Sequence, residues 1–131
     1  MKTLTIDIEE IDSLYSKLQN DKEIRCIVFE CERMRELNLI DFEIGLSYEE
    51  EEEKDILHEK NNRKINKVIP RFIPNTITHL SFNDEIHLDE RAYNYFPQSI
   101  LKIKDEYKHI ITRDDIKEIL KQFLHLRYEV L

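Results

Sequence analysis

Glycine is almost absent from this chain: Gly45 is the only one in 131 residues. Loops that cradle nucleotide phosphates need several glycines, which let backbone N–H groups approach the phosphate closely. The sequence therefore argues against kinases, P-loop enzymes and dinucleotide-dependent enzymes. We expect neither a bound cofactor nor an enzymatic activity.

Cysteine and histidine are also sparse. The two cysteines, Cys26 and Cys31, have no CxxC partner, and the five histidines show no HExxH pair or other metal-ligand spacing. We therefore expect no metal site. Because an odd number of positions separates Cys26 from Cys31 around a predicted strand, their side chains should point to opposite faces, and a disulfide between them is not expected.

Long apolar runs and a basic net charge are lacking as well. No stretch of about 18 apolar residues is present, and the chain turns acidic at Asp7, too early for a secretory signal. We expect a cytoplasmic protein without a membrane partner. The net charge of −8 repels phosphate backbones, which argues against direct nucleic-acid binding and favours encounter with a basic partner protein.

Apolar residues make up 40% of the chain, enough for one folded domain over residues 1–131. Leu4–Ile6 predicts a strand that leads into an amphipathic helix, with a capping box formed by Asp7 and Glu10. Ile24–Phe29 predicts a second strand. The length of chain between these strands fits the crossover of a parallel βαβ unit.

The next part of the chain is mixed and then strongly charged. Alternation from Leu37 to Ile44 favours a further strand. Ser47 and Glu50 have the spacing of a capping box, and the acidic run that follows suits a helix N-terminus. Residues 47–67 therefore form either a solvated helix or a mobile insertion. We expect Tyr48, Ile56 and Leu57 to be the residues that pack in that helix.

Two later segments are similar to each other. Pro74-Asn75-Thr76-Ile77 is matched by Pro97-Gln98-Ser99-Ile100 at an offset of 23 residues, within the range of leucine-rich repeats. In each copy the proline ends the preceding element and the polar pair turns the chain. A strand then follows, with Leu80 and Phe82 pointing inward in the first copy and Ile103 in the second.

The first copy resembles the FNIP repeats, a leucine-rich-like family whose units read Ile-Pro-Asn-Ser-Ile-Thr-His-Leu-x-Phe. The match runs from Phe72 to Phe82, and the second copy departs from it with Asp105 where the first has Phe82. The resemblance covers well under half of the chain. It implies a repeat stack that acts as a protein-interaction scaffold, of a type common in amoebae and giant viruses, and hence a place in the host cytoplasm if the protein is viral.

Helices complete the predicted fold. Asp89–Tyr95 favours a short helix, and aromatic residues in and after it would cover the strands: Tyr93, Tyr95 and Phe96. A last helix, capped by Thr112, would close the open end of the stack with its apolar face: Ile116, Ile119, Leu120, Phe123 and Leu124. We predict an α/β fold of short, mainly parallel strands in a leucine-rich-repeat-like stack, with outer helices and a C-terminal capping helix.

The outward side of the stacked strands is the predicted binding surface. Alternation places on it a ladder of six side chains: Cys26, Val28, His79, Ser81, Lys102 and Lys104. We predict a non-catalytic protein–protein interaction module that binds its partner through this ladder. The open edges of such a sheet also allow a homodimer.

Two alternatives remain. The first is an acidic inhibitor or antitoxin that neutralises a basic nuclease or toxin by imitating its phosphate ligand, using Glu49, Glu50, Glu51, Glu52 and Glu53. The second is a metal-dependent nuclease, for which Asp89, Glu106 and Lys108 are the candidate residues. His87, which lies among carboxylates in the sequence, is the candidate general base of an enzyme.

Overall fold

The computed structural model describes the backbone of residues 1–130 and the side chains of residues 1–69 and 73–122. Its strands are β1 (Lys2–Asp7), β2 (Ile24–Glu30), β3 (His79–Phe82), β4 (Lys102–Lys104) and β5 (Ile110–Thr112). Its α-helices are α1 (Leu14–Asn20), α2 (Glu32–Ile44), α3 (Tyr48–Phe72) and α4 (Arg113–Val130). Two 3₁₀ helices complete the set, η1 (Ile8–Ser13) and η2 (Glu90–Tyr95).

The strands form one sheet in the order β1-β2-β3-β4-β5. Neighbouring strands from β1 to β4 are parallel, and β5 pairs with β4 in the antiparallel sense. The predicted α/β class, the βαβ unit and the mainly parallel strands are therefore confirmed. The sequence interpretation missed β5, a strand of three residues whose pairing depends on β4.

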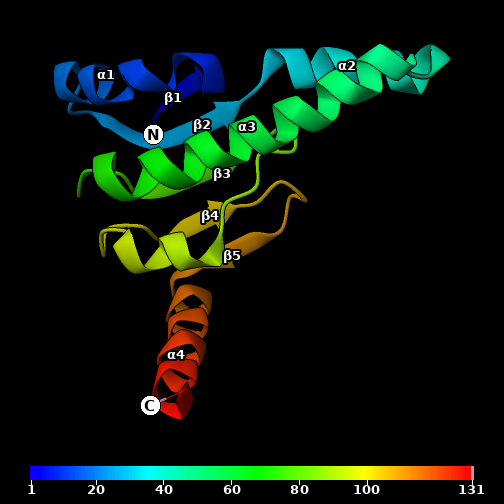
Figure 1. The fold of residues 1–131 in the computed structure, drawn as a ribbon. Helices are drawn as coiled ribbons and strands as arrows, with labels where there is room; N and C mark the ends of the chain where they lie inside the picture. Colours follow the sequence, from blue (N-terminus) through cyan, green and yellow to red (C-terminus); the bar gives the residue numbers. More distant parts are fainter. Residues whose placement is uncertain (131) are drawn as a thin grey trace.

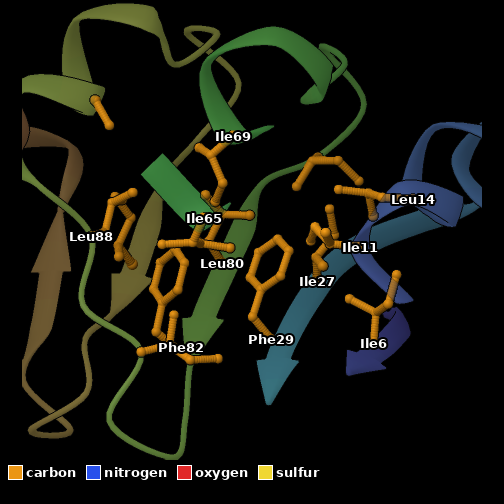
Figure 2. Packing of buried hydrophobic residues seen from close by; sticks show 14 of the residues in the cluster. Ile6, Ile11, Leu14, Ile27, Phe29, Ile65, Ile69, Leu80, Phe82 and Leu88 are labelled. Carbon is orange, nitrogen blue, oxygen red and sulfur yellow. The ribbon is translucent and has the colours of Figure 1, made fainter. Parts of the chain in front are cut away.

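The helices that connect the parallel strands lie on one face of the sheet. In Figure 1, α3 runs in front of β2 and β3, and η2 lies in front of the part of the sheet that holds β4 and β5. The apolar core fills the space between these helices and that face, and Figure 2 shows Ile65 and Ile69 of α3 directed toward the side chains of the strands. The ring of Phe29 on β2 stacks on Phe82 of β3, with centroids 5.2 Å apart. Leu80 and Phe82 thus point inward, as predicted.

The segment from Leu37 to Ile44 is helical, so the strand predicted there is wrong. It forms most of α2, in which Met34 and Leu37 are buried one turn apart. The apolar residues in this stretch fit both the alternation of a strand and the spacing of a helix. The strand prediction used the alternation alone and did not consider Met34, which precedes the stretch. The helix begins after Cys31, whose sulfur accepts a hydrogen bond from the backbone N–H of Met34.

Helix α3 is longer than the helix predicted within residues 47–67. The predicted capping box is present: the Ser47 hydroxyl accepts from the N–H of Glu50, and the Glu50 carboxylate accepts from the N–H of Ser47. The helix continues through Pro70 to Phe72, although a proline in its last turn removes one backbone donor. Its side chains from residues 70–72 lie outside the described part of the chain.

The packing predicted for α3 was also wrong in part. Tyr48 and Ile56 are exposed, and Leu57 alone of the three expected residues packs against the core. The buried side chains come from further along the helix, where Ile65 and Ile69 lie one turn apart. Helix α3 has 25 residues, with a capped and charged start and an apolar end. Only the second half of the helix therefore packs over the sheet.

The remaining helices begin close to the predicted positions. Asp7 caps η1 by accepting from the N–H of Glu9 at 2.9 Å, so the capping box expected with Glu10 is not formed. The region predicted as one helix is divided into η1 and α1. In η2 and the residue after it, Tyr93 and Phe96 are buried as predicted, whereas Tyr95 is exposed.

The last helix, α4, begins after Thr112, which exchanges hydrogen bonds with Asp115. Ile116 is buried, and Ile119 and Leu120 pack against the core from one side of the helix. The expected contribution of Phe123 and Leu124 falls outside the described side chains. Figure 1 shows α4 leading away from the edge strand β5. Within the described residues, no helix has the length and apolar character needed to cross a membrane.

The stacked rings provide a test of the fold. Phe82→Ala should lower the free energy of unfolding by about 3–5 kcal/mol, because it removes a fully buried ring and leaves a cavity beside Phe29. Urea denaturation followed by circular dichroism measures this change. Tyr95→Ala, which truncates an exposed ring nearby in the sequence, should stay within about 0.5 kcal/mol of the wild type. Equal losses in the two variants would contradict the described packing.

Candidate functional site

The six residues of the predicted ladder lie side by side on one face of the sheet. Strand pairing aligns Cys26 with His79 and His79 with Lys102 in one row. The next row aligns Val28 with Ser81 and Ser81 with Lys104. Between the two rows lie residues whose side chains point to the opposite face and are buried: Ile27, Leu80 and Ile103.

Four further residues, which the sequence interpretation did not include, extend the two rows to the edges of the sheet. They are Thr3 and Thr5 on β1 and Ile110 and Thr112 on β5. The two threonines could have been predicted from the sequence, because they alternate with the inward residues Leu4 and Ile6 along the strand. The positions of Ile110 and Thr112 on this face depend on the antiparallel pairing of β5 with β4. We call this ten-residue surface the ladder face.

No helix of the described residues covers the ladder face, because the connecting helices lie on the opposite face (Figure 1). Its central side chains are half-buried by their neighbours in the sheet, whereas Lys102 and Lys104 are exposed. Parallel sheets normally have both faces covered. A parallel sheet with one uncovered face thus leaves a wide surface available for contact.

The ladder face contains a shallow groove of about 230 Å³ over β3, β4 and β5. Its lining is almost entirely apolar. Leu80 and Ile103 also border the groove, but their side chains are buried in the core on the opposite face of the sheet. Ile110 forms one wall and is 62% exposed, which is unusual for a large aliphatic side chain on a sheet. The other residues that line the groove are Cys26, His79, Ser81, Lys102 and Lys104.

The charged groups on the ladder face are unevenly placed. Among the residues that the structure describes, Lys102 and Lys104 have no ion-pair partner. At the end of β2, Glu30 pairs with Arg35 at 2.8 Å. The two lysines are thus available to a carboxylate of another molecule.

Cys26 and His79 at the centre of the ladder face have local partners. Nδ1 of His79 lies 2.7 Å from the Thr78 hydroxyl, which also donates to the carbonyl of Arg25. Burial raises the pKa of the Cys26 thiol, although a hydrogen bond with Thr3 acts in the opposite direction. Cys26 is therefore protonated at neutral pH, which makes it a packing residue of the surface and a poor nucleophile.

The predicted acidic site is separate from the ladder face. The run Glu49–Glu53 lies at the start of α3, where α2 and α3 extend past the strands (Figure 1). Two of its carboxylates have partners within the protein. Glu50 caps the helix, and Glu53 accepts two hydrogen bonds from Arg33 at 2.7 and 2.9 Å. These bonds lower the pKa of both groups, so Glu50 and Glu53 are ionised at neutral pH.

Three carboxylates of the acidic run remain exposed: Glu49, Glu51 and Glu52. Glu51 lines a cleft of about 470 Å³ between the end of α2 and the start of α3. The cleft also contains Asp41, Leu46, Lys54, Asp55, His58 and Glu85. The structure therefore contains two distinct candidate surfaces, one on the sheet and one on the two helices.

The residues of the alternative enzymatic interpretations have other contacts. Asp89 caps η2, and the amine of Lys108 donates to the side chain of Asn83 at 2.6 Å. His87 pairs with Glu106 at 2.6 Å, and not with the carboxylates next to it in the sequence. Within the described side chains, no group of three or more acidic, histidine or cysteine residues is arranged to hold a metal ion.

Comparison with known proteins adds no relative. No family model, curated protein or solved structure matches the chain.

Thiol labelling tests the placement of the two cysteines. In the native protein, Ellman's reagent should react with Cys26, and Cys31 should react only after denaturation because it is buried at the end of β2. The reaction of Cys26 should need a higher pH than that of free cysteine, since its pKa is raised. Cys26→Ser should remove the native reaction. Equal rates for both thiols in the native protein would contradict this placement.

Proposed function

We propose that the protein is a non-catalytic interaction module that binds another protein through the ladder face. The observation that carries the proposal is the uncovered face of a mainly parallel sheet, with an apolar groove over β3, β4 and β5. Exposed apolar surface on a sheet is stabilised by a partner that excludes water from it. The two exposed lysines beside the groove add a site for carboxylates and thereby favour one orientation of the partner.

The similarity between the two proline-containing segments supports a leucine-rich-like origin for this face. The N–H of Ile77 donates to the carbonyl of Pro74 at 3.1 Å, and the N–H of Ile100 donates to that of Pro97 at 3.2 Å. The same turn therefore precedes β3 and β4. Both isoleucines are fully buried below their turns.

Hydrogen bonds between neighbouring segments repeat with the same offset. The N–H of Thr78 donates to the carbonyl of Arg25 at 2.8 Å, and the N–H of Leu101 donates to the carbonyl of Thr78 at 2.8 Å. Thr78 and Leu101 are separated by the 23 residues that separate Pro74 and Pro97. We propose on this basis that β3 and β4 are two units of a short stack of the FNIP type, a family of interaction scaffolds.

A protein partner fits the ladder face better than a small molecule or a nucleic acid. The groove is shallow and open, whereas small-molecule sites bury most of the ligand in a concave pocket. Two lysines are few for a phosphate backbone, and the chain as a whole repels one with its charge of −8. A protein side chain that enters the groove, flanked by carboxylates, matches both its apolar lining and its lysines.

Affinity capture tests the proposed function. The double variant Lys102→Glu/Lys104→Glu reverses the charge beside the groove at two exposed positions, so the fold should be retained. Protein captured from cells that naturally contain this chain should fall by about tenfold or more relative to wild type, as measured by quantitative mass spectrometry.

The matched control for this experiment is Lys117→Glu/Lys121→Glu, which makes the same change at exposed positions of α4. It should capture the partner as well as the wild type does. If the ladder variant and the control retain the same partners at the same level, the ladder face is not the binding surface.

A further inference from the structure

The negative charge of the protein is concentrated where α2 and α3 join. Residues 41–55, which we call the helical tip, contain eight carboxylates and one lysine, a net charge of −7 out of −8 for the whole chain. The tip extends past the strands in Figure 1. The remainder of the protein is therefore almost neutral, and the electrostatic field comes mainly from one end of the molecule.

The helical tip also carries the most exposed apolar side chains of the described residues. Phe42, Ile44 and Tyr48 are 89%, 85% and 81% exposed, more than any other large apolar residue described. They flank the turn that contains Gly45, whose φ of 79° ends α2 in a conformation that favours glycine. When a partner covers aromatic and aliphatic side chains that are this exposed, removal of their apolar surface from water stabilises the complex.

The acidic cleft is lined in part by residues close in sequence to these apolar residues. Asp41 and Leu46, which line it, belong to the same turn region as Phe42 and Ile44. Glu51 and Asp55 come from the first two turns of α3. The cleft can therefore take up a basic side chain whose neighbours contact the apolar residues.

The net charge of the helical tip favours one kind of binding partner over the others. A second copy would bring a net charge of −7 against another −7, and a nucleic acid or anionic membrane would be repelled in the same way. A basic partner gains both from the carboxylates and from burial of the apolar residues. A basic amphipathic helix presents cations and an apolar stripe at the spacing of successive turns.

We propose that the helical tip is a second docking surface, which binds a basic amphipathic helix of a partner protein through Phe42, Ile44 and Tyr48 and the adjoining acidic cleft. The apolar stripe of the helix covers the three exposed side chains, and its lysines or arginines pair with the cleft. This surface is independent of the ladder face, and either can bind without the other.

A designed peptide tests this second surface. The probe is a synthetic 18-residue helix with leucine on one face and lysine on the other, titrated into ¹⁵N-labelled protein at a salt concentration of about 0.05 M. We expect saturable binding with chemical-shift changes confined to the helical tip and its cleft. The same peptide with glutamate in place of lysine should bind at least about tenfold more weakly.

The apolar part of the surface is tested with Phe42→Ser/Tyr48→Ser, which should weaken binding of the lysine peptide about tenfold without affecting the fold. Tyr95→Ser/Leu101→Ser, which removes exposed apolar groups elsewhere, should leave binding unchanged. The proposal is overturned if the lysine peptide does not bind or perturbs other residues, if the Phe42/Tyr48 variant binds as tightly as wild type, or if the glutamate peptide binds equally well. Dimerisation through the tip in sedimentation experiments would also overturn it.

Discussion

A parallel pair of strands needs a connection that crosses one face of the sheet, and in this protein the connections from β1 to β4 cross the same face (Figure 1). The core is therefore one-sided: α3 and the shorter helices bury the inward side chains, including the stacked pair Phe29 and Phe82. No second layer covers the outward side chains within the part of the chain that the structure describes. The groove, the half-buried Val28 and the exposed lysines are all consequences of this arrangement.

The carboxylate of Asp84 joins the two halves of the sheet at the ends of β2 and β3. It accepts from the N–H of Cys31 at 2.9 Å and from the guanidinium of Arg35 at 2.9 Å, and its side chain is only 13% exposed. The φ of Asp84 is 52°, a conformation uncommon for residues other than glycine but well tolerated by aspartate. The start of α2, and with it the direction in which the helical tip projects, is thus tied to the loop that follows β3.

The local patterns of the sequence account for much of the sheet and for the arrangement of the ladder. Proline turns and alternation around Leu80 identified β3 and its inward face, because one strand with one buried face has a strict period of two. The same reasoning failed for Leu37–Ile44, where apolar residues fit two periods at once and burial of Met34 selects the helix. β5 was missed since three residues give no period and their strand exists only through pairing with β4.

The helical tip could be predicted only in part. The acidic run and its capping box are local signals, and both were evident in the sequence. Exposure of Phe42, Ile44 and Tyr48 is a tertiary property, because apolar residues in a sequence are ordinarily assigned to the core. Only the projection of α2 and α3 beyond the sheet shows that no part of the described core reaches them.

The antiparallel return of β5 restricts how such a fold changes in length over evolution. The turn between β4 and β5 is held by Asp105, which accepts from the backbone N–H groups of Tyr107 and His109, and Lys108 adopts a φ of 67° within it. A parallel strand added after β4 would have to displace this hairpin, because β5 occupies that edge of β4. A parallel strand gained between β1 and β4 would instead widen the exposed surface while leaving this edge of the sheet unchanged.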